Sequence, residues 1–279
     1  MLPPVELIIF DLDGTLLDST GTLSPFTRET LSLMDARGLL FTVATGRALH
    51  GARAPLTGHD FRLPQAFKNG VVIWDPKKNA YTHSWFLPQG MAEQSVEWLL
   101  EQGIAPFVFT IAPDGRHYAF HAPLRSPVDE LMLRDFQARP DLTVLPLAEL
   151  PPDARISNVS AIGEPGPIDR VAERARSTPG LVAYSSTAIE SGELNWIDIH
   201  RVEASKGTAV DLLKRELGAT RTIVFGDSYN DESMFEIADE AYAPENAKAP
   251  LRERATQVIG HHNDDGIAHF LRERFSLAS

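Results

Sequence analysis

Two aspartates, Asp11 and Asp13, directly follow the apolar run 5–10. A short run rich in Ile, Leu and Phe that ends in turn residues predicts a buried strand. The carboxyl end of such a strand is where open α/β sheets bind their ligands. Two carboxylates placed there lose hydration and repel each other, so they need a compensating partner. With a phosphate substrate that partner would be Mg²⁺. The alternative is that Asp-Leu-Asp-Gly is only a turn, because Asp and Gly tolerate left-handed geometry.

Both ends of the chain alternate between strand and helix patterns. A helix start at Ser24-Pro25 and a stop at Gly38 follow from the capping preferences of these residue types. We expect strands at 5–10, 40–44, 222–225 and 241–243, and helices at 25–37, 205–217, 231–238 and 265–274. This alternation predicts an α/β fold with a Rossmann-like parallel sheet.

The middle of the chain has a different pattern. After an expected hairpin at 71–86, a helix at 89–102 precedes a second hairpin around Pro113-Asp114-Gly115. A further helix, strand, helix and strand are expected at 128–137, 157–162, 168–176 and 181–184. This pattern predicts an inserted α+β cap domain at 84–183. The catalytic core would then be discontinuous, formed by 1–83 and 184–279, and the strand expected at 196–199 would belong to it.

Composition limits the partners of this 279-residue chain. Its formal net charge of −12 argues against a nucleic-acid partner, which needs many Lys and Arg. No apolar run approaches the ~18 residues of a membrane span, and the N-terminus does not resemble a signal peptide. We therefore expect no membrane partner and a cytoplasmic location; nothing indicates an oligomeric state. The absence of Cys excludes disulfides and thiolate metal sites.

Four short motifs in order carry a resemblance to a known family. The segment Asp11-Leu12-Asp13-Gly14-Thr15 matches the D-x-D-G-T signature of the haloacid dehalogenase-like (HAD) superfamily. Thr45 and Lys206 match the next two positions of that superfamily, and 226–231 resembles the G-D-x-x-N-D motif of its Cof-type branch, whose members carry a C2B cap. Asn69-Gly70, Ser205-Lys206-Gly207 and 264–267 also resemble that branch.

The resemblance implies a role for each acidic motif residue. Asp11 would be the nucleophile that forms an aspartyl-phosphate, and Asp13 the general acid and base. Mg²⁺ would bind the carboxylates of Asp11 and Asp227 and the backbone carbonyl of Asp13. Asp231 would lie behind the direct ligands and orient them. A dehalogenase is not implied, because that branch lacks the second aspartate.

The resemblance also implies a phosphate site. Thr45 would donate its hydroxyl to the phosphoryl group, with the amides of Gly46 and Arg47 at a helix start. Lys206 would hold the phosphoryl group and the Asp11 carboxylate as a fixed charge, and Asn230 would help to orient the metal site. We expect the Arg47 guanidinium to face the cleft and bind a substrate phosphate or carboxylate.

Purely structural roles remain open for several of these residues. Thr45 could be a plain N-cap, Asn230 and Asp231 could cap the helix that follows, and Lys206 could be solvated surface. His261-His262 are expected to lie in a solvated loop, because adjacent histidines without a third partner do not form a metal site. Asp264-Asp265-Gly266 is expected to form a turn and a cap for the last helix. Trp98 is expected in the core.

The implied function is a Mg²⁺-dependent phosphatase that hydrolyses a small phosphorylated metabolite, and a sugar phosphate is the first expectation for that substrate. The cap would exclude water and read the organic part of the substrate. One alternative is a phosphomutase of the phosphomannomutase type, which would release little phosphate. Another is a catalytically silent binding protein on the same fold, which predicts a broken motif. Asp11, Asp13, Thr45, Lys206 and Asp227 are all present.

Overall fold

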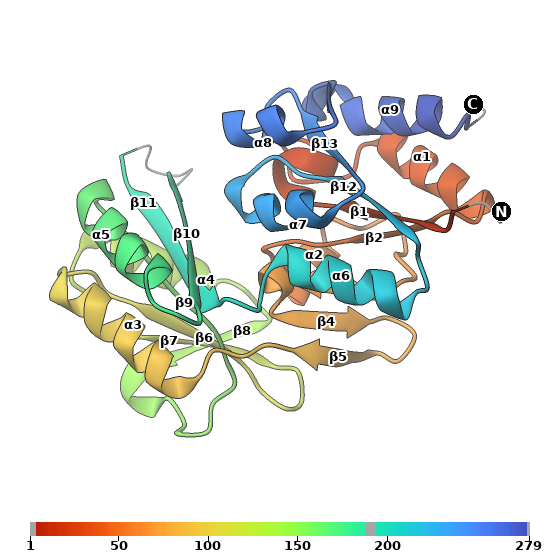
Figure 1. The fold of residues 1–279 in the computed structure, drawn as a ribbon. Helices are drawn as coiled ribbons and strands as arrows, with labels where there is room; N and C mark the ends of the chain where they lie inside the picture. The colour runs from red at the N-terminus through yellow and green to blue at the C-terminus, as the bar shows by residue number, and fades with distance from the viewer. Residues whose placement is uncertain (1–3, 188–192, 278–279) are drawn as a thin grey trace. The chain divides into compact units, whose positions relative to one another are not determined.

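The structure, a computed structural model, describes residues 4–187 and 193–277. The chain forms two compact units: the first comprises Met1–Ser84 and Ser205–Ser279, and the second comprises Trp85–Ala204. The first unit is therefore discontinuous in sequence, with the second inserted into it (Figure 1).

The first unit is built on a parallel sheet with the order β14-β13-β12-β1-β2. In the part of the chain that the structure describes, its strands are β1 (Glu6–Phe10), β2 (Leu40–Val43), β12 (Arg221–Phe225), β13 (Glu240–Pro244) and β14 (Gln257–Ile259). The central strand β1 pairs with β12 on one side and β2 on the other, and residues 7–10 are fully buried. Burial on both faces explains why residues 7–10 of this strand are all apolar rather than alternating.

Helices cover both faces of this sheet. They are α1 (Pro25–Ala36), α2 (Leu49–Arg53), α6 (Lys206–Glu216), α7 (Glu232–Ile237), α8 (Ala249–Arg254) and α9 (Gly266–Arg274). Helices α1 and α9 contact each other on one face, and α6 and α7 contact each other on the other face (Figure 1). The start of α1 is fixed by the Ser24 hydroxyl, which accepts a hydrogen bond from the Thr27 amide, and that of α6 by Ser205, which caps Thr208 in the same way.

A small antiparallel sheet completes the first unit. Its strands are β3 (Gln65–Phe67), β4 (Val72–Asp75) and β5 (Ala80–Ser84). An isolated bridge between Ala44 and Ala66 joins its first strand to the end of β2. The turn Lys68–Gly70 between β3 and β4 therefore lies beside the segment that follows β2.

The second unit is an α+β layer structure with the strand order β10-β11-β9-β6-β7-β8. Its described strands are β6 (Phe107–Ile111), β7 (His117–His121), β8 (Leu142–Pro146), β9 (Ile156–Gly163), β10 (Leu181–Thr187) and β11 (Asn195–Arg201). Its helices are α3 (Gln89–Glu101), α4 (Pro127–Gln137) and α5 (Pro165–Arg176). Every neighbouring pair is antiparallel except β7 and β8.

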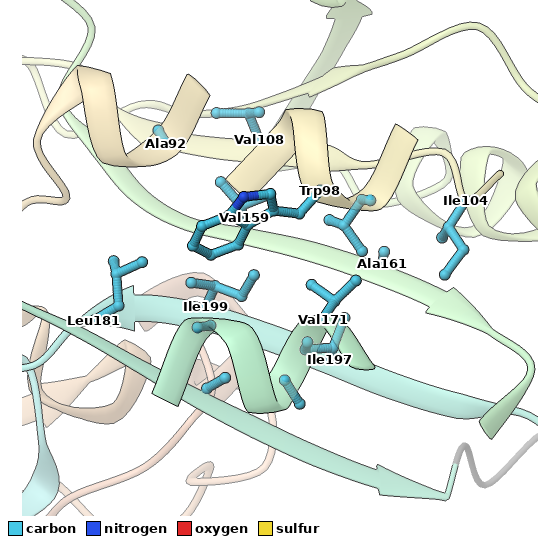
Figure 2. Packing of buried hydrophobic residues seen from close by; sticks show 14 of the residues in the cluster. Ala92, Trp98, Ile104, Val108, Val159, Ala161, Val171, Leu181, Ile197 and Ile199 are labelled. Carbon is cyan, nitrogen blue, oxygen red and sulfur yellow. The ribbon is translucent and has the colours of Figure 1, made fainter. Parts of the chain in front are cut away.

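A hydrophobic cluster joins α3 and α5 to one face of this sheet (Figure 2). Trp98 of α3 lies within it, only 3 % exposed, beside Val159 of β9, and the Arg174 guanidinium covers the indole ring at 4.7 Å. Phe107 packs with Phe136 in a second cluster that involves α4. The expectation that Trp98 is a core residue is confirmed.

The expected fold class is confirmed, but the boundary of the second unit differs from the expectation. The core was expected to resume at residue 184, with the strand at 196–199 as part of it. Instead, Asp198 of β11 pairs with Tyr184 of β10 and Ser160 of β9, so both strands belong to the antiparallel sheet of the second unit. A strand directly before a helix has the same local pattern in either unit, and only its pairing assigns it. No helix among the described residues is long and apolar enough to cross a membrane.

Candidate active site

The ends of β1 and β12 bring two of the motif aspartates together. Phe10 and Phe225 are partners in the parallel register, and the next residue, Asp11, donates its amide to the Phe225 carbonyl at 2.9 Å. Asp227 follows two residues after Phe225. The two side chains therefore lie close together at the carboxyl edge of the sheet. Asp11 is 5 % exposed, so its carboxylate is held away from water.

Lys206, the first residue of α6, is fully buried and bridges two carboxylates. Its ammonium group lies 2.5 Å from Oδ1 of Asp11 and 2.5 Å from Oδ1 of Asp231. The interpretation of Lys206 as solvated surface is excluded by this burial. A charge at this position is unfavourable for the helix dipole, and the two carboxylates compensate it.

The charges in this cluster shift one another's proton affinities. Burial raises the pKa of Asp11 well above its usual range against the opposing charge of Lys206, and Asp231 and Asp227 raise it further. Burial, together with the charge of Asp231, also raises the pKa of Asp227 to about 7. Burial alone would lower the pKa of Lys206, but the charges of Asp11 and Asp231 outweigh it and raise that pKa. The cluster therefore holds more negative charge than its one lysine can neutralise.

The carboxylates fit a small divalent cation. Of the residues that the structure describes, Asp11, Asp227 and Asp231 each offer a carboxylate oxygen within 4.8 Å of the others. The oxygens of Asp231 are already engaged, Oδ1 by Lys206 and Oδ2 by the amides of Asp227 and Ser228 at 2.9 Å. Oδ2 of Asp11 and Oδ2 of Asp227 lie outside the hydrogen bonds among the described residues. Mg²⁺ prefers oxygen ligands such as these carboxylates, and its positive charge would offset their excess negative charge. Because both oxygens of Asp231 are engaged within the protein, Asp231 is suited to an orienting role.

The turn after Asp11 is tied to the segments that follow β12 and β13. The Thr15 hydroxyl donates to Oδ1 of Asp227 at 3.1 Å, and the Asn246 side chain donates to the Gly14 carbonyl at 2.7 Å. Neither Thr15 nor Asn246 was expected to support the site. Thr15 lies inside the motif that the sequence analysis used, so its position was a signal for this contact. For Asn246 the only signal in the sequence was its position shortly after the end of a strand.

Asp13 is not one of the three clustered carboxylates and forms a fork with Arg47. Nε and Nη2 of Arg47 lie 2.8 and 2.6 Å from Oδ2 and Oδ1 of Asp13, and the Asp13 side chain is 57 % exposed. Nη1 of Arg47 donates to the Gly51 carbonyl at 2.9 Å. The hydrogen bonds that Arg47 donates to Asp13 raise the pKa of the Arg47 guanidinium. Arg47 was expected to face a substrate anion; in this structure three of its five N–H groups are engaged by Asp13 and Gly51.

The loop after β2 places Thr45 beside this fork. Thr45 is fully buried, and its hydroxyl oxygen accepts a hydrogen bond from the Arg47 amide at 3.1 Å. The amides of Gly46 and Arg47 were expected to open a helix, but α2 begins only at Leu49. The Arg47 amide is also already engaged by Thr45. The local capping role of Thr45 is therefore present, and its hydroxyl proton is left to donate elsewhere.

Asn230 and Asp231 lie in the turn between β12 and α7. Asp231 forms a capping box with Ser228, so the structural role considered for it is present together with its contact to Lys206. Asn230 does not join the carboxylates; its Nδ2 donates to Oδ1 of Asn69 at 2.9 Å. Asn69 was noted in the sequence only as part of a motif and received no role.

Residues outside these motifs have structural roles. His262 was expected to be solvated with His261, but its Nδ1 lies 2.8 Å from the Leu17 carbonyl and helps to hold the loop after β1. Asp265 begins α9 in a left-handed conformation, and its carboxylate accepts hydrogen bonds from Ser24 and Thr27 at the start of α1. The expected turn before α9 is thus present, and it also ties α9 to α1.

Comparisons with known proteins identify the family and the fold of this chain. A family described as haloacid dehalogenase-like hydrolase matches residues 8–271. The chain is 26 % identical to the 5-amino-6-(5-phospho-D-ribitylamino)uracil phosphatase YwtE of Bacillus subtilis, with 98 % of this chain and 99 % of that protein aligned. It is 27 % identical to the pyridoxal phosphate phosphatase YbhA of Escherichia coli, with 95 % and 97 % aligned. A solved sugar phosphatase of HAD subclass IIB has the same fold, with a TM-score of 0.78, 19 % identity, and coverage of 98 % of this chain and 100 % of that one.

Proposed function

The chain belongs to the haloacid dehalogenase-like hydrolase family and is a phosphoric monoester hydrolase, and we propose that it is Mg²⁺-dependent and acts through an aspartyl-phosphate on Asp11. The observation that carries the proposal is the cluster of Asp11, Asp227 and Asp231, in which the buried Asp11 and Asp231 both pair with Lys206. Buried carboxylates with raised pKa values are costly to fold, and they are typical of sites that hold a cation for chemistry.

Asp11 is the proposed nucleophile. Lys206 holds Oδ1 of Asp11, so the other oxygen is presented in a fixed direction. One carboxylate oxygen of Asp11 attacks phosphorus as the bond from phosphorus to the substrate oxygen breaks, and its second oxygen would face the cation. When bound at Asp11 and Asp227, Mg²⁺ would polarise the phosphoryl group and neutralise part of its charge. Thr45, Gly46, Lys206 and Asn230 are proposed to hold the phosphoryl oxygens.

Asp13 is the proposed proton carrier in both halves of the reaction. It gives a proton to the departing substrate oxygen, and it then accepts one from the water that attacks the aspartyl-phosphate. That second attack breaks the bond between Asp11 and phosphorus and releases inorganic phosphate. Arg47 fixes the Asp13 carboxylate in a two-point fork, which suits the second half, in which Asp13 must be ionised. A substrate anion would contact Arg47 through the N–H groups outside this fork, or through the fork itself if it opens.

The proposed substrate is a small phosphorylated metabolite, with a sugar phosphate first. The names of the relatives support this class, since one acts on a phosphorylated ribitylamino-uracil and another on pyridoxal phosphate. We propose that the second unit acts as the cap that discriminates among such compounds, and that the first unit supplies the chemistry. The boundaries proposed for that cap are the ones seen in the structure, Trp85–Ala204.

The test is a screen of phosphorylated metabolites for release of inorganic phosphate, with Mg²⁺ and with excess EDTA. Sugar phosphates, phosphorylated ribityl compounds, pyridoxal phosphate and p-nitrophenyl phosphate form the panel. Asp11→Asn should abolish release, whereas Asp211→Asn, an exposed aspartate on α6, should leave it unchanged. Conversion of one sugar phosphate into another without net phosphate release would indicate a mutase instead. A wild type that releases phosphate from no member of the panel would contradict the proposal.

A further inference from the structure

We propose that Asn69 is a positioning residue of the active site, which holds Asn230 and the loop after β2 in register with each other. The proposal rests on the phosphatase function above, in which Asn230 helps to hold the phosphoryl group. Asn69 lies in the turn Lys68–Gly70, between β3 and β4, and is 5 % exposed. None of the catalytic roles assigned above uses this turn.

The backbone of the turn is held in an unusual conformation. Lys68, Asn69 and Gly70 have successive φ angles of 52°, 55° and 92°. Two adjacent side-chain-bearing residues in the left-handed region are uncommon, and they persist only where surrounding contacts enforce them. The contacts here are to the loop after β2. The amide of Lys68 donates to the Arg47 carbonyl and that of Asn69 to the Thr45 carbonyl, both at 2.9 Å.

The side chain of Asn69 joins that loop to the turn after β12. Oδ1 of Asn69 accepts the hydrogen bond from Nδ2 of Asn230 at 2.9 Å. A Cβ at Gly46 would lie 3.1 Å from Oδ1 of Asn69 and 3.7 Å from Nδ2 of Asn230. The absence of a side chain at Gly46 therefore gives room for the two amides to meet. Three separate segments converge at this one hydrogen bond.

The same turn also rests on the start of α6. A Cβ at Gly70 would lie 2.3 Å from the carbonyl oxygen of Ser205, the residue that caps the helix beginning at Lys206. Only glycine allows this approach, and its positive φ also favours glycine. The turn Lys68–Gly70 therefore contacts the loop that carries Thr45, the turn that carries Asn230 and the residue that caps the helix of Lys206.

The consequence is a fixed direction for the Asn230 amide. One of its two N–H groups is committed to Asn69, so the remaining N–H and the carbonyl oxygen point in set directions. Without the acceptor on Asn69, Asn230 would sample other rotamers and would meet the phosphoryl group less often in a productive geometry. Loss of such an outer partner typically lowers activity by about 10–100-fold. We expect this loss in kcat and little change in KM, because most substrate contacts are unaffected.

The variant that isolates the side chain is Asn69→Gly, since glycine adopts the left-handed conformation without strain, which alanine would not. The matched control is Asn79→Gly, because Asn79 also has a positive φ of 50° and lies in the exposed turn before β5. Both variants lose an asparagine from a left-handed position and gain the same unfolded-chain entropy. Only the first is expected to lower kcat, and both should melt cooperatively.

A double-mutant cycle with Asn230→Ala then separates positioning from a general structural effect. If Asn69 acts through Asn230, the double variant should have the kcat of Asn230→Ala alone. The same cycle is measured on the rise in melting temperature produced by Mg²⁺ with orthovanadate, a phosphate mimic, which requires no turnover. The positioning role would be overturned if the effects of Asn69→Gly and Asn230→Ala on kcat were simply additive. It would also be overturned if Asn69→Gly were as active as Asn79→Gly. A wild type without turnover would refute the phosphatase function, and the vanadate cycle would still decide whether Asn69 acts through Asn230.

Discussion

Replacement of Lys206 by methionine removes the one buried cation that two buried carboxylates share. Methionine keeps most of the length of the side chain and cannot pair with Asp11 or Asp231. Removing one partner of a buried ion pair costs about 3–5 kcal/mol, because the remaining charge is left without compensation. Total stabilities are about 5–15 kcal/mol, so the metal-free variant should lose a large part of its free energy of unfolding. Its activity should fall as well, since the direction of the Asp11 carboxylate is no longer fixed.

The assay is urea unfolding of the metal-free protein, followed by circular dichroism. Lys214→Met is the matched control: Lys214 lies on the same helix, is 28 % exposed, and pairs with Asp239 at 3.1 Å. An exposed pair of this kind contributes about 0–1 kcal/mol. The double variant Lys206→Met with Asp231→Asn removes one of the uncompensated carboxylates and should recover part of the lost stability. It also keeps the test decisive if the single variant does not fold.

Magnesium gives an independent check of the same reasoning. Without Lys206 the cluster has one more uncompensated negative charge, so Mg²⁺ should stabilise the Lys206→Met variant more than it stabilises the wild type. A Lys206→Met protein whose stability lies within about 1 kcal/mol of Lys214→Met would refute the argument. It would mean that the carboxylates are protonated in the folded state and need no cation.

Three further predictions follow from the same cluster. Excess EDTA should abolish phosphate release and Mg²⁺ should restore it, whereas Ca²⁺ should substitute poorly because it prefers more ligands at longer distances; full activity in chelator would contradict the metal site. Asp11→Asn should be inactive yet no less stable than the wild type without metal, because it removes a buried carboxylate whose pKa is raised; a clear loss of stability would show that Asp11 is a net stabilising partner of Lys206. In metal-free protein, Asp227→Asn should gain stability relative to the wild type as the pH rises from about 4 to 7. The pKa of Asp227 is about 7 in the folded protein against an ordinary 3.8, so between these pH values the folded wild type holds a proton that the unfolded chain has released. The free energy of unfolding of the wild type therefore falls as the pH rises through this window, by at most about 4 kcal/mol. A difference between variant and wild type that does not change with pH would exclude the raised pKa.

The sequence predicted the parts of the site that depend on local pattern. Asp11 and Asp227 follow apolar runs, and the carboxyl ends of neighbouring parallel strands necessarily share an edge. Lys206 follows a serine that is a good N-cap, which placed it correctly at the start of α6. In each case a strand or helix terminus fixes where the side chain begins, so the residue type and its position in the motif were sufficient.

Contacts between distant segments could not be predicted in the same way. The fork between Arg47 and Asp13 depends on the path of the loop after β2, and a guanidinium near a strand end fits a substrate anion as well as a neighbouring carboxylate. The hydrogen bond of Asn69 with Asn230 joins residues that are 161 positions apart. The assignment of β11 to the second unit likewise depends on pairing, because its sequence suits either sheet. All three contacts are decided by tertiary packing and not by periodicity.

The charges around the site explain how an acidic protein can bind an anionic substrate. The chain carries a formal charge of −12, and the cations that its motifs place beside the nucleophile and the proton carrier are both engaged, Lys206 by Asp11 and Asp231, and Arg47 by Asp13. With Asp227 included, four carboxylates face two cations, which leaves two formal negative charges. A phosphate dianion would be repelled by this arrangement, and one divalent cation would bring the formal charge to zero. The raised pKa values of Asp11 and Asp227 have the same cause, because without a metal the excess negative charge is reduced by binding protons instead. Binding of Mg²⁺ and release of protons are therefore expected to be coupled, and substrate affinity should depend on the metal as strongly as the chemical step does.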